Sequence, residues 1–183
     1  SYSGWYRCHI CVEGFILRKK SHLSLAGYIV DVVDADMIDH PLAFRFGSLE
    51  PDLVPSFITT KHRIDLTFHK LEKKINKVID EYDKNKGMTI GLSKDLGVIT
   101  HYIADYFTYP HNSHYPGNIK DHCHYENHLK HGLRAYIRSG EAVFGGAGYK
   151  RSFSTADEML EYIQEAHEEY MKQPGSVEND CKY

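Results

Sequence analysis

The sequence predicts an all-α protein, a single compact domain of about six helices. Apolar residues recur at intervals of three and four along most of the chain, and the alternation typical of strands is scarce. A length of 183 residues suits one domain, and we find neither an internal repeat nor a low-complexity linker. We therefore expect an N-terminal extension (1–19), a helical domain (20–173) and a C-terminal tail (174–183).

Three helices are predicted in the first half of the chain, over residues 21–33, 41–50 and 61–85. Ser21 is a favourable N-cap for the first helix, and Pro41 occupies a favoured first position in the second. Pro51 is expected to end the second helix because a proline restricts the residue before it, and residues 53–60 then read as a loop. The third helix has the clearest apolar stripe.

Three more helices are predicted in the second half, over residues 93–108, 119–139 and 154–172. Ser93 is the expected cap of the first, which should stop before Pro110. Gly140 is suited to end the next helix. Thr155 and Glu158 have the spacing of a capping box at the start of the last.

Composition narrows the possible functions. The formal net charge of −3 argues against a broad surface for polyanions, although a local basic groove remains compatible with it. No apolar run is long enough to span a bilayer, and no export signal is visible at the N-terminus. Four scattered cysteines do not form a disulfide framework, so we expect a cytoplasmic protein.

Histidine is concentrated in one region, with seven of the thirteen histidines between positions 101 and 131. His101 and Asp105 are four residues apart and therefore project from one face of a helix, and His111 follows just past its end. His122 and Glu126 repeat the spacing on the next helix. Zinc usually takes about four ligands, so these five donors indicate at least two metal ions.

Less specific interpretations remain open for parts of this pattern. A single His–Asp pair can simply be a hydrogen-bonded pair in a core. Gly97, on the same face as His101, is expected to leave room beside a ligand. A second set of histidines lies on a different face of its helix and is expected to form a polar surface; it comprises His124, His128 and His131. The pair Cys8 and Cys11 has no second CxxC to complete a zinc finger.

The ordered set of polar residues resembles the zinc-dependent phospholipase C family, which is related to fungal zinc nucleases that cut single-stranded nucleic acids. The resemblance rests on four segments of the sequence, "SHLSLA", "GSLEPD", "HYIADYFTYPH" and "HCHYE". The resemblance implies an all-helical fold around a multinuclear cleft with two or three Zn²⁺ ions. The ligands that it implies for one ion are Asp52, His62, His101 and Asp105. Those for a second ion are His111, His122 and Glu126, and Asp105 would also bridge towards a third ion bound by His22.

Two positions are less clear within this resemblance. His62 and His69 share a helical face, and we choose His62 because it lies nearer the loop that carries Asp52. In the secreted phospholipases a terminal Trp completes the third site, whereas Trp5 here follows other residues. The third site is therefore expected to be incomplete or finished by another group.

The expected activity is hydrolysis of a phosphodiester by metal-activated water, with Asp52 as a ligand that also acts as general base. The expected substrate is a phospholipid or related small phosphodiester, with nucleic acid as an alternative. Some aromatic side chains could line a cleft for either substrate, although most of them are expected to be ordinary core residues: Phe57, Tyr102, Tyr109 and Tyr115. A non-catalytic, metal-binding scaffold is the remaining alternative.

Overall fold

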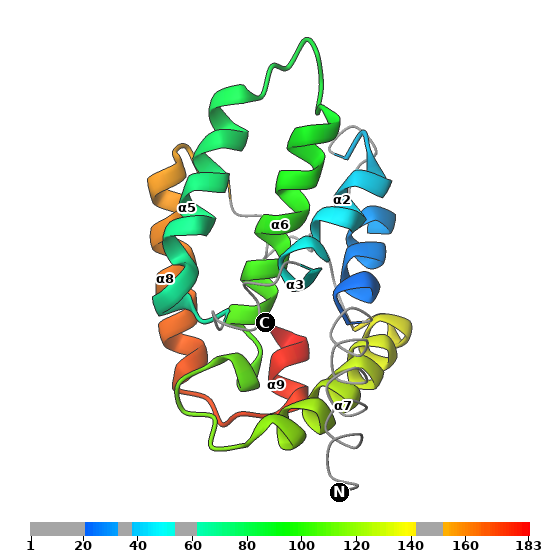
Figure 1. Cartoon of the computed structure of the whole chain (residues 1–183), viewed down its shortest axis with the longest axis vertical. Helices are drawn as coiled ribbons and strands as arrows, with labels where there is room; N and C mark the ends of the chain where they lie inside the picture. The colour runs from blue at the N-terminus through cyan, green and yellow to red at the C-terminus, as the bar shows by residue number, and fades with distance from the viewer. Residues whose placement is uncertain (1–20, 33–37, 54–61, 142–151) are drawn as a thin grey trace, which may run out of the picture.

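The computed structural model describes residues 21–32, 38–53, 62–141 and 152–183. Regular structure within these ranges is helical apart from an isolated β-bridge between Asp83 and Gly87, which confirms the all-α prediction. The expected N-terminal extension and most of the expected loop at 53–60 lie outside the described residues. Figure 1 shows an elongated arrangement of helices along one axis.

Helix α6 (Ile90–Tyr106) runs through the middle of the molecule, with α5 (Ile64–Glu81) on one side and α2 (Pro41–Gly47) on the other (Figure 1). Buried side chains from α5, α6 and α8 (Ala156–Met171) form the main core: Leu71, Ile75, Val98, Ile99, Tyr102, Tyr106, Leu160 and Ile163. A smaller core joins Ala26, Ile38 and Phe44. Because α6 packs on both sides, the polar residues that it carries are drawn into the interior.

Two helix boundaries differ from the sequence-based expectation. Thr89, and not Ser93, caps α6, since the Thr89 hydroxyl accepts the Leu92 N–H at 3.2 Å. Ser93 lies inside the helix and is fully buried. The end of the helix is also earlier than expected, at Tyr106, and a 3₁₀ turn, η2 (Tyr109–His111), contains Pro110.

Pro51 lies in the first turn of a helix, although the sequence predicted that it would end one. Helix α2 stops at Gly47, and the four-residue helix α3 (Glu50–Leu53) follows almost directly. Pro51 fits the first turn of α3, where an N–H has no partner within the helix. Asp52 is thereby placed inside a short helix and not in a loop after one.

Helix α5 is shorter than the predicted range 61–85 because its backbone is extended at both Arg63 and Tyr82. Helix α7 (Ile119–Ser139) has the predicted bounds, and Gly140 ends it in the left-handed region at φ 75°. Thr155 caps α8 as predicted, by accepting the Glu158 N–H.

The C-terminal residues form a helix where the sequence predicted a polar tail. Helix α9 (Val177–Lys182) is capped by Ser176, whose side chain accepts the Asn179 N–H. It packs against α7, as Figure 1 shows near the C-terminus. Helices α3 and α9 are therefore additional to the six that periodicity predicted; each spans less than two turns, which is too short for a clear apolar stripe.

Candidate metal centre

All eight predicted ligands lie in three groups of potential metal-binding side chains. Within each group, one nitrogen or oxygen from every residue lies within 4.8 Å of the others. The groups are His22, Asp52 and His101; His62, His101 and Asp105; and His111, His122 and Glu126. They are supplied by the helix over residues 21–32, by α3, α6, η2 and α7, and by the residues just before α5.

His101 and Asp105 occupy successive turns of α6, and both are almost completely buried. His101 Nε2 lies 3.2 Å from Asp105 Oδ2, as the i,i+4 spacing predicts for a helix. His62 joins them from just before α5: its Nδ1 lies 2.9 Å from Asp105 Oδ2 and 3.0 Å from His101 Nε2. His69, the alternative to His62, is exposed on α5.

The backbone of Ser48, just after α2, fixes the orientation of the His101 ring. His101 Nδ1 lies 2.9 Å from the Ser48 carbonyl oxygen, which can only accept a hydrogen bond. The proton is therefore on Nδ1, and Nε2 faces Asp105 with its lone pair available. Metal-binding histidines in proteins are commonly oriented in this way, but a backbone carbonyl gives no signal in sequence.

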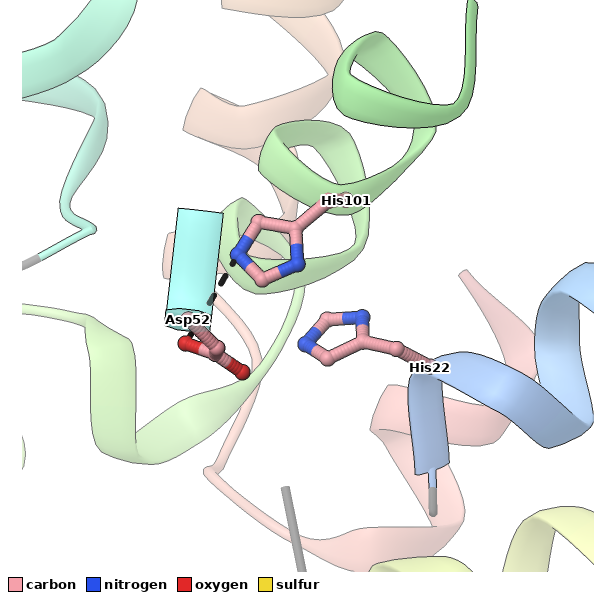
Figure 2. Close-up of side chains that lie close together, drawn as sticks. All are labelled: His22, Asp52 and His101. Atoms are coloured by element: carbon pink, nitrogen blue, oxygen red, sulfur yellow. Dashed lines mark ion pairs between the residues drawn. The ribbon is translucent and has the colours of Figure 1, made fainter. Parts of the chain in front are cut away.

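Asp52 has a buried carboxylate with no hydrogen-bond partner among the described residues. Two imidazole nitrogens of the described residues lie near its Oδ1, His62 Nδ1 at 3.8 Å and His101 Nε2 at 4.0 Å. Figure 2 shows the side chains of His22, Asp52 and His101 pointing toward one another from three separate helices. A buried carboxylate is costly unless a positive charge compensates it, so this arrangement fits a cation.

His22 completes this side of the cluster. Its ring stacks on the His101 ring with centroids 4.0 Å apart, and its Nε2 lies 3.2 Å from Asp105 Oδ1. Burial alone lowers the pKa of His22, but the charge and hydrogen bond of Asp105, with Asp52 and Glu126, raise it to about 9. The carboxylates thus favour a positive charge at His22.

The second subsite joins η2 to α7. Glu126 Oε1 lies 3.2 Å from His111 Nε2 and 3.3 Å from His122 Nε2. Burial raises the pKa of Glu126, but hydrogen bonds and charge from the two histidines lower it well below its usual range. His111 Nδ1 lies 3.5 Å from Asp105 Oδ2, so Asp105 stands between this subsite and the His101 subsite.

Asn112 holds the turn that carries His111, a role that sequence spacing did not indicate. Its side-chain amide donates to the carbonyl oxygens of Tyr106 at 2.9 Å and Thr108 at 3.0 Å. Its carbonyl oxygen lies 2.7 Å from Nε2 of His167 on α8. This network orders the chain immediately beside a predicted ligand.

Gly97 has a different role from the one expected. A Cβ at this position would lie 2.1 Å from the Phe44 carbonyl oxygen and 2.8 Å from the Ser48 nitrogen. Gly47 is constrained in the same contact, because its Cβ would lie 2.0 Å from the Lys94 carbonyl oxygen. The absent side chain therefore leaves room for the backbone of α2 and not for a ligand.

Other candidates lie outside the three groups or outside the described residues. The α7 histidines His124, His128 and His131 are all exposed, as expected for a polar surface. Tyr102 belongs to the main core, and the rings of Tyr109 and Tyr115 pack at 5.0 Å. The positions that lie outside the described residues are Trp5, Cys8, Cys11 and Phe57.

Imidazole nitrogens and carboxylate oxygens are donors that suit zinc, and the three groups offer such donors in the interior of the helical fold. The fold and the donors thus indicate a helical protein whose buried side chains could hold metal ions. A family model described as zinc-dependent phospholipase C matches residues 21–177, and the chain belongs to that family. Neither the curated proteins nor the solved structures gave a significant match. Within the described residues, none of the helices has the length and apolarity needed to cross a membrane.

Proposed function

We propose that the protein hydrolyses a phosphodiester with zinc, in the manner of a phospholipase C. The observation that carries this proposal is the buried Asp52 carboxylate, which lacks a hydrogen bond from any described residue and faces the imidazoles of His22 and His101. A purely structural pair would satisfy such oxygens with N–H or O–H donors. Membership of the zinc-dependent phospholipase C family supports the same assignment.

The proposed ligands divide as the distances suggest. Asp52, His62, His101 and Asp105 would hold one zinc ion. A second ion would be held by His111, His122 and Glu126, whose donors lie together between η2 and α7. His22 and the Oδ1 atom of Asp105, 3.2 Å apart, would contribute to a third. Asp105 thus offers its two oxygens to different neighbours and is the proposed bridge.

When bound, zinc ions would lower the pKa of water and neutralise charge on the phosphate oxygens. The chain's own contribution is to hold the donors and to move a proton. The Ser48 carbonyl fixes His101 with Nε2 towards the cluster. Asp52, whose oxygens have no competing donor among the described residues, would accept the proton from the attacking water.

The proposal is tested with the full chain, purified and loaded with zinc. We expect release of phosphocholine from phosphatidylcholine in mixed micelles. Activity should disappear with a chelator and return with added zinc. Single-stranded DNA serves as a second substrate in the same assay. Cleavage of DNA without action on phosphatidylcholine would identify nucleic acid, and not lipid, as the substrate class. Bound zinc without hydrolysis of either substrate or of a small chromogenic phosphodiester would favour the scaffold interpretation.

The role of Asp52 is tested separately with Asp52→Asn, which keeps the shape of the side chain and removes its charge. We expect turnover to fall at least about 100-fold, the lower range for loss of a general base, while most of the zinc remains bound. Asp80→Asn, an exposed change on α5, is the matched control and should behave as the wild type. Full activity in Asp52→Asn would remove this residue from the mechanism.

A further inference from the structure

The Asp180 carboxylate on α9 connects three other parts of the structure. Its Oδ2 accepts hydrogen bonds from the Tyr109 backbone N–H at 3.0 Å and from the Tyr125 hydroxyl at 2.7 Å. Its Oδ1 accepts a hydrogen bond from the Tyr170 hydroxyl at 2.6 Å. The three donors belong to η2, α7 and α8, so one side chain ties α9 to each of these elements.

Two of these donors lie beside proposed metal ligands. Tyr109 begins the 3₁₀ turn that ends at His111, and Tyr125 directly precedes Glu126 on α7. His111 Nε2 and Glu126 Oε1 are 3.2 Å apart, so they can share an ion only while η2 and α7 keep their present separation. Asp180 joins η2 to α7 through a single oxygen atom.

Helix α9 and the residues just before it pack closely against both η2 and α7, so a side chain of α9 can hold these two elements at a fixed separation. A Cβ at Gly132 of α7 would lie 2.6 Å from Val177 Cγ1, so α9 packs directly on that backbone. A Cβ at Gly175 would lie 2.2 Å from the Tyr109 ring. The segment from Gly175 to Asp180 is therefore packed against both η2 and α7.

The two tyrosine hydroxyls are suited to donate to the Asp180 carboxylate. Burial, together with the hydrogen bond and charge of Asp180, raises the pKa of Tyr125 well above its usual range. Burial and the same carboxylate also raise the pKa of Tyr170. Both phenols thus remain protonated donors at any pH near neutrality.

We propose that Asp180 is a positioning residue that holds His111 and Glu126 at the separation needed to bind one metal ion. The family match ends at residue 177, so this residue lies just beyond the part of the chain that the family describes. The inference rests on the proposed metal site at His111, His122 and Glu126. It assigns a function to α9, which contributes none of the proposed ligands.

The test compares zinc affinity and stoichiometry in the full chain, measured by competition with a chromogenic chelator, and the visible spectrum of the cobalt-substituted protein. Asp180→Ala should lower the affinity for one zinc ion by about 10- to 100-fold, the range typical for residues that orient metal ligands. The remaining ions should stay bound. The cobalt spectrum should change for that ion alone. Glu178→Gln is the matched control, because Glu178 is exposed on the same helix and pairs with Lys182.

Two tyrosine variants separate positioning from general stability. Tyr125→Phe removes the hydrogen bond to Asp180 that lies next to Glu126, and it should lower the affinity for the same ion. Tyr170→Phe removes the hydrogen bond between Asp180 and α8, and it should leave zinc affinity unchanged. If Asp180→Ala does not fold, this tyrosine comparison decides the proposal. Wild-type affinity in Asp180→Ala, or equal effects of the two tyrosine variants, would overturn it.

His111→Ala distinguishes this inference from the metal assignment. Loss of one ion in His111→Ala with no loss in Asp180→Ala would reject only the positioning role. Unchanged stoichiometry in His111→Ala would reject the metal site itself, and with it the basis for positioning.

Discussion

His101 Nδ1 lies 2.9 Å from the carbonyl oxygen of Ser48, which places a ring nitrogen of α6 against the end of α2. The carbonyl can only accept, so it selects the tautomer of His101 with the proton on Nδ1. The other nitrogen, Nε2, then faces His62 and Asp105. A contact between two helices thereby decides which atom of a predicted ligand is available.

The first prediction concerns this tautomer. Nitrogen-15 NMR of the labelled chain should show His101 as a neutral ring protonated at Nδ1, because burial and the neighbouring His22 lower its pKa. Ser48→Ala should leave the spectrum of His101 unchanged, since the bond uses the backbone and the Ser48 hydroxyl donates to Arg45. A ring protonated at Nε2 would show that Ser48 does not orient it.

The second prediction concerns the close contact between α2 and α6. Gly97→Ala should destabilise the protein by about 1–3 kcal/mol, the usual cost of overpacking, because the new Cβ meets the backbone of Phe44 and Ser48. Gly91→Ala is the control, since the nearest atom would be 3.8 Å away and alanine favours a helix. Urea unfolding measures both variants. Equal stability of Gly97→Ala and the wild type would mean that the contact can relax.

The third prediction concerns Asp105, which lies within 3.5 Å of nitrogens from four histidines: His22, His62, His101 and His111. Because it stands between the subsites, Asp105→Ala should lose more than one zinc ion by metal analysis. Asp80→Ala, on the exposed face of α5, should retain all of them. Full zinc stoichiometry in Asp105→Ala would refute the bridging role.

The fourth prediction concerns Asp95 on α6, a buried carboxylate that accepts hydrogen bonds from Lys74 and Lys77 of α5. Burial raises the pKa of Asp95, but the two lysines outweigh burial and lower it below its usual value. A carboxylate with a lowered pKa in the folded state stabilises the protein above its unfolded pKa and loses that effect as the pH falls. Asp95→Asn should therefore cost about 1–2 kcal/mol at pH 7, because both lysines are partly exposed.

The difference in unfolding free energy between wild type and Asp95→Asn should shrink as the pH falls below about 4. Urea unfolding at pH 7 and at pH 3.5 measures this difference directly. Asp80→Asn, an exposed change on α5, is the control. A constant difference across this range would exclude Asp95 as the titrating group.

Sequence was sufficient for the features that helical periodicity controls. The all-α class, the bounds of α7 and the cap at Thr155 follow from local patterns of apolar and capping residues. The pairs His101 with Asp105 and His122 with Glu126 are adjacent in space because a spacing of four residues brings side chains together on any helix. These two pairs are the part of the candidate site that can be predicted without knowing how the helices pack.

Capping and proline patterns predicted the wrong helix end where more than one residue could form it. Ser93 and Thr89 are both good caps, and the choice of Thr89 places Ser93 in the interior, where α2 packs on α6. Pro51 can end one helix or begin another, and the turn after Gly47 decides for the second. Helices as short as α3 and α9 have too few residues for a periodic pattern.

The sequence alone was enough to predict a helical chain with two His–carboxylate pairs at a spacing of four residues, and its resemblance to a family indicated which distant residues should join them. Tertiary structure alone decided that His22, Asp52 and His62 converge on α6, that Ser48 orients His101, and that Gly97 admits the α2 backbone. It also brought Asp180 to Tyr109 and Tyr125. The physical reason is that contacts between residues distant in the chain depend on how helix faces pack, which local periodicity does not specify.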